Sequence, residues 1–227
     1  MKKVPYNRQT TDTPNPIARY AHLSREGHAL AKVEQLLPPG GRVVDFGCGI
    51  GSFLNALTER RPEADLLGYD PGQAGSAESF ARVSKMDAVD ARSVDILCAL
   101  EVLEHLSDQQ LVSFINHATR VMKPGGAIVI SVPIIGGLTL PLKELNRMIL
   151  FRRKSDYSLS ELLRASFLGV PAERPSDRGP THKGFDFRAL RVMLTSTFTL
   201  KSEDRSPFSR LPWWLNSQAF FVLTQRE

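Results

Sequence analysis

The chain has 227 residues, of which 42% are hydrophobic, a composition typical of a globular protein with room for one α/β domain and an insertion. No run of about eighteen apolar residues is present, so the sequence predicts no membrane-spanning helix. The net charge is only +5, and there is no dense tract of lysine and arginine with interleaved aromatic residues. Nucleic acid is therefore not favoured as a partner.

Residues 1–15 are polar and contain proline, and we expect them to be mobile. No apolar signal segment follows the N-terminal lysines, which favours a cytoplasmic protein. Two cysteines, Cys48 and Cys98, do not make a disulfide framework, in agreement with a reducing compartment.

From residue 17 onward, helical and strand patterns alternate along the sequence. A helical pattern over 17–37 ends at two prolines and two glycines. The later elements are predicted as strands near 42–46, 64–69, 80–83, 94–100 and 127–132, helices near 52–60, 72–78, 107–121 and 185–195, and final strands over 198–203 and 219–224. This alternation predicts an α/β fold with a mainly parallel sheet covered by helices on both faces.

The segment from Arg42 to Leu54 is a buried-strand pattern that runs into a glycine turn and then an apolar helix. Gly47, Gly49 and Gly51 allow the backbone to turn sharply and approach a ligand closely, because a Cβ atom would clash or forbid positive φ. The spacing differs from the dinucleotide fingerprint, which would require glycine at position 52. The turn therefore predicts a nucleotide-cofactor site for a different nucleoside.

Three further segments follow the glycine turn in a recognisable order. Asp70 ends the next strand pattern, nineteen residues after Gly51, where its carboxylate can accept both ribose hydroxyl protons. Residues 94–106 are a strand pattern with an acidic end, and residues 122–126 read Met-Lys-Pro-Gly-Gly. From about residue 42 to 133, the chain resembles the class I methyltransferases that depend on S-adenosylmethionine (SAM). It looks similar to the short bacterial members associated with quinone and surface-polysaccharide biosynthesis.

The resemblance implies a Rossmann-like, seven-stranded, mostly parallel sheet with helices on both faces and an antiparallel C-terminal strand. Residues 1–227 would form a single methyltransferase domain. Residues 134–183 would form an inserted helical lid over the methyl acceptor, where specificity is expected to reside.

The resemblance also implies which residues bind SAM. The glycine turn would hold the methionine part, Asp45 its cationic groups, Asp70 the ribose, and the segment around Asp87 the adenine. The predicted cofactor-binding residues are Asp45, Gly47, Cys48, Gly49, Gly51, Asp70, Pro71, Met86, Asp87, Ala99 and Leu100. Simpler roles remain open: Asp45 as a loop cap, Asp70 as a turn residue, and residues 84–88 as a solvated turn.

Glu101, Glu104 and His105 are the predicted catalytic residues. If a helical turn begins near Glu101, the three side chains share one face at positions i, i+3 and i+4. His105 would act as general base, because imidazole changes charge near neutral pH.

The same motif is similar to that of metal-using quinone O-methyltransferases and of small-RNA 2′-O-methyltransferases, in which a second histidine completes the metal site. The corresponding set here would be Glu101, Glu104, His105 and His182. A divalent metal is possible but not favoured, since many methyltransferases without a metal resemble this chain in the same residues.

Residues 134–183 carry nine basic and five acidic side chains, which nearly accounts for the positive charge of the whole chain. Over 138–154, basic and apolar residues are interleaved. This stretch is predicted either as an amphipathic helix on an anionic membrane surface or as an acceptor pocket for a phosphate-bearing or lipid-linked molecule. A third interpretation is a plain lid with solvated arginines.

The sequence thus predicts a SAM-dependent O-methyltransferase with a small-molecule, quinone-type or saccharide or lipid-linked acceptor. Two alternatives remain open. One is a small-RNA 2′-O-methyltransferase with a Glu/Glu/His/His metal site, and the other is a non-catalytic SAM-binding partner at a membrane. We expect a cytoplasmic location, with contact to the inner face of the membrane as an open alternative. No particular oligomeric state is predicted.

Overall fold

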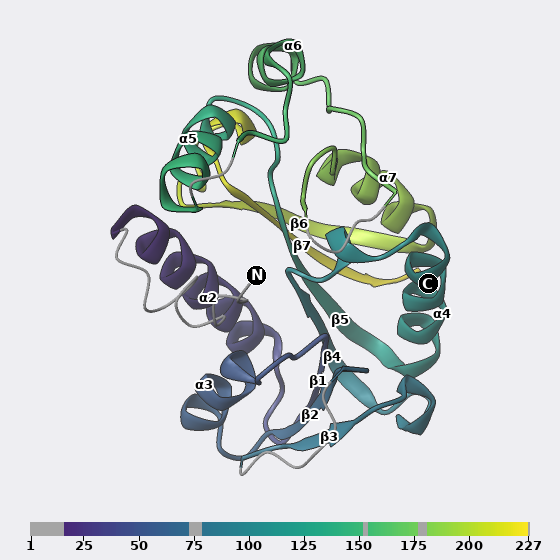
Figure 1. Cartoon of the computed structure of the whole chain (residues 1–227). Helices are drawn as coiled ribbons and strands as arrows, with labels where there is room; N and C mark the ends of the chain where they lie inside the picture. The colour runs from purple at the N-terminus through teal and green to yellow at the C-terminus, as the bar shows by residue number, and fades with distance from the viewer. Residues whose placement is uncertain (1–15, 73–78, 152–153, 177–180, 227) are drawn as a thin grey trace.

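The computed structural model describes residues 16–72, 79–151, 154–176 and 181–226, with one seven-stranded sheet in the order β3-β2-β1-β4-β5-β7-β6 (Figure 1). The strands are β1 (Arg42–Phe46), β2 (Asp65–Tyr69), β3 (Ala81–Val83), β4 (Val94–Leu100), β5 (Met122–Pro133), β6 (Phe198–Ser206) and β7 (Gln218–Gln225). Strands β1 to β5 pair in parallel, whereas β7 is antiparallel to both β5 and β6. The predicted Rossmann-like sheet is confirmed.

Helices cover both faces of the sheet, as predicted. The helical elements outside the short loops are α2 (Pro16–Leu36), α3 (Ser52–Arg60), α4 (Asp108–Val121), α5 (Thr139–Phe151), α6 (Leu159–Leu163), the π-helical turn η3 (Arg164–Leu168) and α7 (Phe187–Thr197). Figure 1 shows α2 and α3 on one side of the sheet and α4 and α7 on the other. Within the described ranges, no helix is long and apolar enough to cross a bilayer.

The central strands are buried on both faces, which explains their nearly continuous apolar sequence. Successive side chains point to opposite faces. Val43 of β1 packs in the core formed with α2 and α3, whereas Val44 packs in the same core as Phe114 of α4. Because both faces are covered, the loops at the carboxyl ends of the parallel strands are the place where a ligand can reach the sheet.

Two strands are longer than predicted. β5 begins at Met122 rather than near residue 127, because the Met-Lys-Pro-Gly-Gly segment continues the strand and Met122 pairs with Val94 of β4. β6 extends to Ser206, where it pairs with Gln218 at the start of β7. Most of the helix predicted over 72–78, and all of residues 1–15, lie outside the described residues.

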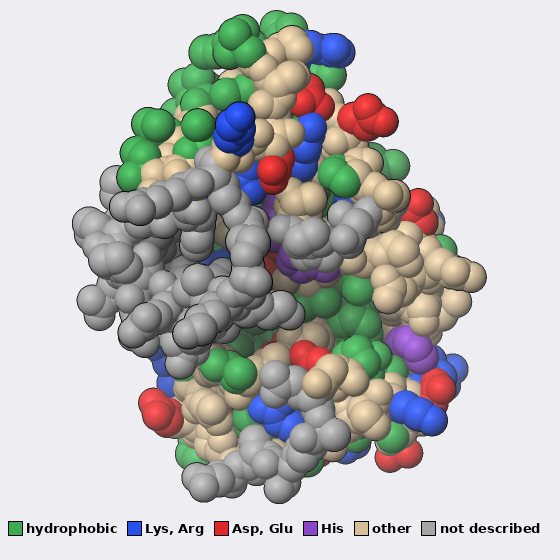
Figure 2. Space-filling model, in the orientation of Figure 1, with side chains coloured by type: hydrophobic (Ala, Val, Ile, Leu, Met, Phe, Trp, Pro, Cys, Tyr) green, Lys and Arg blue, Asp and Glu red, His purple; other side chains and the backbone are tan. Residues whose placement is uncertain are grey.

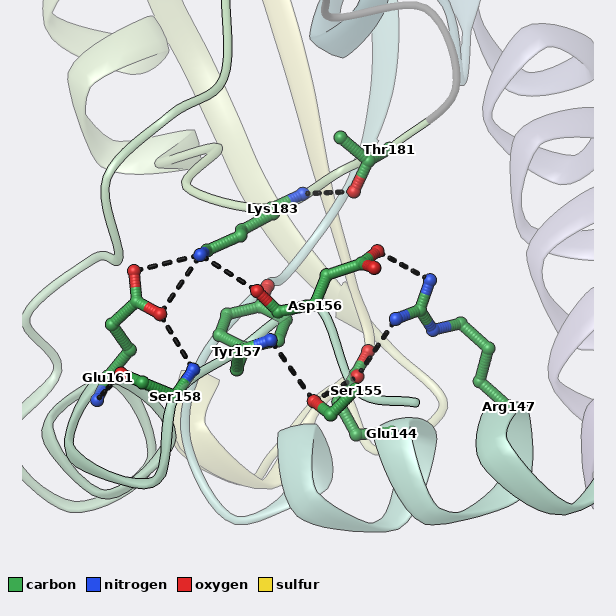
Figure 3. Close-up of polar contacts among 9 residues, drawn as sticks. All are labelled: Glu144, Arg147, Ser155, Asp156, Tyr157, Ser158, Glu161, Thr181 and Lys183. Atoms are coloured by element: carbon green, nitrogen blue, oxygen red, sulfur yellow. Dashed lines mark hydrogen bonds and ion pairs between the residues drawn. The ribbon is translucent and has the colours of Figure 1, made fainter. Parts of the chain in front are cut away.

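The segment between β5 and α7 lies at the carboxyl end of the parallel strands, with α6 at the top of Figure 1. Polar contacts join its parts, as Figure 3 shows. Arg147 of α5 pairs with Glu144 at 3.1 Å and with Asp156 at 2.7 Å. Lys183 pairs with Glu161 of α6 at 2.8 Å. These ion pairs fix the chain on either side of α6 to the two helices of the insertion.

Candidate active site

The glycine turn connects β1 to α3 at the carboxyl edge of the sheet. All three glycines have positive φ, with 82° at Gly47, 51° at Gly49 and 86° at Gly51. A Cβ atom at Gly47 would overlap Val102, and one at Gly51 would overlap Phe80. The fold itself therefore requires glycine at these two positions.

Gly49 is different, because a Cβ atom there would meet no atom of the described residues within 4 Å. The Gly49 N–H donates to Oδ2 of Asp70 at 3.0 Å, and the Gly49 carbonyl accepts from Nη1 of Arg82 at 2.6 Å. The backbone is thus held firmly, and among the described residues nothing fills the space above it, as a turn that receives a cofactor requires. Arg82, on β3, was not among the predicted site residues, since nothing in its short strand pattern indicated this contact.

Asp70 follows β2 and connects two turns. Its Oδ2 atom accepts the N–H of Gly49, and its Oδ1 atom accepts the N–H of Gly72 at 2.8 Å. Asp70 is therefore a turn residue, one of the roles considered from the sequence. Each carboxylate oxygen can accept a second hydrogen bond, so a ribose hydroxyl can bind the same group. The cofactor role of Asp70 and of the neighbouring Pro71 stays a prediction.

The carboxyl group of Asp45 lies at the end of β1, and the residue is only 4% exposed. Burial, and to a smaller extent the charge of Asp70, raises the pKa of Asp45 to about 7. A cationic ligand beside this group would favour its ionised form. The environment therefore fits the predicted role of Asp45 toward the cationic end of SAM.

We expect SAM binding to release a proton from Asp45 near neutral pH. A sulfonium or ammonium group beside Asp45 lowers the pKa of the carboxyl group, so the affinity for SAM is expected to rise as the pH increases from about 6 to 8. Calorimetric titrations in buffers of different ionisation enthalpy count the released protons. Asp45→Asn is the control and is expected to remove this release. An unchanged proton release in Asp45→Asn would contradict the placement of Asp45 beside the cationic part of SAM.

Four other predicted cofactor residues lie in different surroundings. Met86 is 2% exposed and packs in the core beside α4, and Ala99 belongs to the same core. Leu100 is half-buried at the end of β4. The side chain of Asp87 is 83% exposed, with Oδ1 3.8 Å from Nδ1 of His117. Contact of these residues with adenine or the methyl group stays a prediction.

Glu101 directly follows β4 and has a φ of 58°, in the left-handed region that costs a residue with a Cβ atom roughly 1–2 kcal/mol. The Glu101 carboxylate accepts hydrogen bonds from Ser131 Oγ and Gln218 Nε2, both at 3.1 Å. Its Oε2 atom also lies 3.3 Å from Nη1 of Arg25. These contacts hold the strained residue in place, and both oxygens of its carboxylate have partners.

The acidic turn, residues 101–105 after β4, differs from one expectation. The short helical turn η2 (Leu103–His105) begins two residues after Glu101, whose positive φ ends the strand. The predicted helical face shared by Glu101, Glu104 and His105 is therefore wrong. Instead, Glu101 bonds to side chains of β5 and β7, and Glu104 and His105 lie in the following turn.

Glu104 and His105 meet His182, which is 77 residues away from His105 in the sequence. The Nε2 atoms of the two histidines are 3.2 Å apart, and they lie 3.9 Å (His105) and 4.0 Å (His182) from Oε1 of Glu104. The segment between β5 and α7 thus places a side chain beside the predicted catalytic residues. Burial, followed by the nearby His105 and cationic side chains, lowers the pKa of His182 to about 4, so this ring is neutral at pH 7.

Glu104 is completely buried, and neither carboxylate oxygen has a hydrogen-bond partner among the described residues. Burial and the charge of Glu101 raise the pKa of Glu104 well above its ordinary value. The ligand atoms of Glu104, His105 and His182 lie within 4.8 Å of one another, a set that fits a divalent cation such as Zn²⁺ or Mn²⁺. Glu101, which pairs with Arg25, is outside this set.

The comparisons with known proteins agree with this geometry. The sheet order and the glycine turn are typical of class I SAM-dependent methyltransferases, and SAM is the cofactor of this class. A family model described as a methyltransferase domain matches residues 18–175, and the chain belongs to that family.

Similar proteins in other organisms include two ubiquinone biosynthesis O-methyltransferases. The protein from Bradyrhizobium sp. (strain ORS 278) is 32% identical over 104 residues, and that from Pseudomonas aeruginosa (strain UCBPP-PA14) is 33% identical over 108 residues. Each match covers 40% of this chain, and 40% and 44% of the two relatives, respectively. The chain therefore spans about two fifths of the length of these relatives.

Solved structures share the fold at low sequence identity. The PH0226 protein from Pyrococcus horikoshii OT3 is 14% identical, with 97% of this chain and 96% of that chain covered and a TM-score of 0.58. A TehB-like SAM-dependent methyltransferase from Corynebacterium glutamicum is 13% identical, with 87% of each chain covered and a TM-score of 0.53.

Proposed function

We propose that the chain transfers the methyl group of SAM to a hydroxyl oxygen of a small-molecule acceptor. The observation that carries this proposal is the contact between the two functional turns, since Val102 of the acidic turn lies against Gly47 of the glycine turn. The catalytic candidate His105 follows three residues later. The names of the similar ubiquinone O-methyltransferases support an oxygen acceptor of the quinone type, with saccharide or lipid-linked acceptors as related candidates.

In this proposal, His105 accepts the proton of the acceptor hydroxyl while the oxygen attacks the methyl group in line with the breaking bond to sulfur. SAM, when bound, supplies a methyl group activated by the positive sulfur. His182 lies within hydrogen-bond distance of His105 and holds its ring in place. The lid carries His182 and helps to exclude water from the reaction.

A methyl-transfer screen with labelled SAM tests this proposal. The panel contains quinol precursors, saccharides, lipid-linked saccharides and a small RNA, each with and without the protein. Label on the oxygen of a small-molecule hydroxyl is the expected result. Label on the 2′-oxygen of the RNA would favour the nucleic-acid alternative. SAM binding without transfer to any acceptor would favour a non-catalytic partner.

The cluster of Glu104, His105 and His182 supports a second candidate, a metal-assisted methyl transfer. The carboxylate of Glu104 is buried, faces two imidazole nitrogens and has no hydrogen-bond partner among the described residues, so a bound divalent cation would stabilise its ionised form. Such an ion would orient the acceptor hydroxyl and favour its deprotonation.

We expect Mn²⁺ at a concentration well above its dissociation constant to raise the melting temperature of the parent protein, because an ion that binds only the folded state stabilises it. The shift is expected to disappear in Glu104→Gln. Thermal unfolding with Mn²⁺, and with a chelator as baseline, makes the comparison. The absence of a shift in the parent protein would leave Glu104 protonated and His105 acting without a metal.

Contact with a membrane through residues 138–154 is a further part of the proposal. Leu142, Leu145 and Ile149 form an exposed apolar stripe on α5, at positions i, i+3 and i+7. Figure 2 shows more hydrophobic side chains gathered at the upper end of the molecule, where α5 and α6 lie. Leu159 and Phe167 are among the exposed residues of this region.

We expect the parent protein to sediment with vesicles that contain anionic phosphatidylglycerol, and the triple variant Leu142→Ser, Leu145→Ser, Ile149→Ser to remain in the supernatant. The reason is that the stripe removes its apolar area from water when it enters the interface. Val192→Ser is the matched control, since Val192 is an exposed apolar residue of α7. Equal sedimentation of the parent and the triple variant would contradict membrane contact through α5.

A further inference from the structure

Three cationic side chains from different parts of the chain surround the acidic turn after β4. Arg25 of α2 pairs with Glu101, and Arg174 of the lid donates a hydrogen bond to the backbone carbonyl of Glu104. Lys143 of α5 is the third, and its charge acts on Glu101 and on His182. None of the three lies in the segment from 42 to 133 that carries the resemblance to methyltransferases.

The charges in this place do not balance. Arg25, Lys143 and Arg174 are three cations, and Glu101 and Glu104 are two acidic groups even when both are ionised. A protonated Glu104, or a divalent cation bound to it, makes the excess larger. Among the residues that the structure describes, these five groups therefore give a net positive charge beside His105 in every one of these states, and a negative group on the acceptor would be attracted to it.

Lys143 differs from Arg147 and Lys183, two other basic residues of the insertion. Figure 3 shows that Arg147 and Lys183 each have a carboxylate partner. The Nζ atom of Lys143 instead donates to two carbonyl oxygens, those of Ile134 at 3.0 Å and Ser217 at 3.2 Å. Within the described part of the chain, no carboxylate lies within ion-pair distance of Lys143, and its third N–H has no partner.

Burial lowers the pKa of Lys143 to about 8, and the charge of Glu101 partly opposes this shift. The side chain is thus still mainly protonated at neutral pH. Taking an ammonium group out of water without a counter-charge is unfavourable, and an anionic group beside it offsets that cost. An acceptor without a negative charge would leave the ammonium group of Lys143 buried without a counter-charge.

We propose that the acceptor carries an oxyanion, either a carboxylate or a phosphate, which Lys143 binds close to the hydroxyl that is methylated. The proposal rests on the methyltransferase function proposed above and names the chemical class of its acceptor. The two carbonyl bonds fix the ammonium group at the junction of β5, β7 and α5, and the third N–H binds the oxyanion.

The first test is a calorimetric titration of inorganic phosphate into the full chain saturated with S-adenosylhomocysteine, which occupies the glycine turn. Lys143→Gln removes the charge but keeps two N–H donors for the carbonyls. We expect this variant to bind phosphate at least about tenfold more weakly than the parent. The reason is that a hydrogen bond from a charged ammonium group to an oxyanion is stronger than one from a neutral amide. Lys201→Gln, on the exposed part of β6, is the matched control and is expected to bind phosphate as the parent does.

The second test compares 3,4-dihydroxybenzoate with 3,4-dihydroxybenzamide as methyl acceptors, because the two differ chiefly in the negative charge. The parent is expected to prefer the benzoate by about tenfold or more in kcat/KM, and Lys143→Gln is expected to lose this preference. Lys143→Arg, which keeps the charge, should retain part of it if it folds as the parent does.

The inference would be overturned if the parent and Lys143→Gln bound phosphate equally, or if neither bound it. Equal kcat/KM values of the parent for the two acceptors would also overturn it. Binding of S-adenosylhomocysteine by every variant shows that each is folded. Failure of the parent to bind S-adenosylhomocysteine would count against the methyltransferase function itself, so the two failures are distinguishable.

Discussion

A His105→Ala protein is expected to transfer methyl groups about a hundredfold or more slowly than the parent, with an unchanged affinity for SAM. Positioned general bases contribute roughly 10² to 10⁴ in rate, and His105 is the imidazole of the acidic turn beside the glycine turn. Its side chain is partly exposed, as a group that meets an incoming acceptor must be. Single-turnover rates at saturating acceptor measure the chemical step.

Calorimetry with S-adenosylhomocysteine is the control for His105→Ala, because it reports the cofactor site and the fold independently of the reaction. His105→Gln provides a second control, since the amide keeps hydrogen-bonding capacity but cannot take up a proton at neutral pH. Equal rates for His105→Ala and the parent at saturating substrate would remove His105 from the chemistry.

Gly49→Ala is expected to weaken SAM binding at least about tenfold while the protein still folds. The positive φ of Gly49 makes any side chain cost roughly 1–2 kcal/mol in stability. No protein atom lies within 4 Å of the added methyl group, so within the described residues it enters the space expected for the cofactor. Overpacking of this kind typically costs about 1–3 kcal/mol, which in binding corresponds to roughly tenfold or more.

Gly125→Ala is the matched control for Gly49→Ala. Gly125 also has a positive φ, 78°, and its added Cβ atom would also meet none of the described residues within 4 Å. It lies near the start of β5, however, at the other end of the strand from the site. Both variants should lose a similar amount of stability, and only Gly49→Ala should lose SAM affinity. A similar loss of affinity in both would show that backbone strain, and not contact with the cofactor, causes it.

The elements that depend on local sequence were predicted well. Continuous apolar runs predicted the central strands, and the helix predicted near 107–121 is α4, whose first turn is capped locally by Ser107 and Gln110. The glycine turn was found because positive φ selects glycine at each position. Each of these features is determined by residues close to one another in the chain.

The contacts that form the rest of the site come from distant parts of the chain. His182 was only an alternative on the basis of resemblance, since no local pattern shows that the segment between β5 and α7 returns to His105. Arg25 and Lys143 were missed, because each has a partner far away in the sequence: Glu101 is 76 residues from Arg25, and Ser217 is 74 residues from Lys143. The helical turn predicted from Glu101 failed for the same reason: bonds to Ser131 and Gln218 hold that residue in a conformation that its own neighbours do not indicate.

The claim that the glycine turn holds SAM is tested most directly by calorimetric titration of the purified full chain with S-adenosylhomocysteine, which keeps the adenosine and amino-acid parts of the cofactor. We predict a single saturable site per chain, with a much weaker interaction in Gly49→Ala than in Gly125→Ala. A correctly folded parent protein that gives no binding heat over a range of temperatures would contradict the claim.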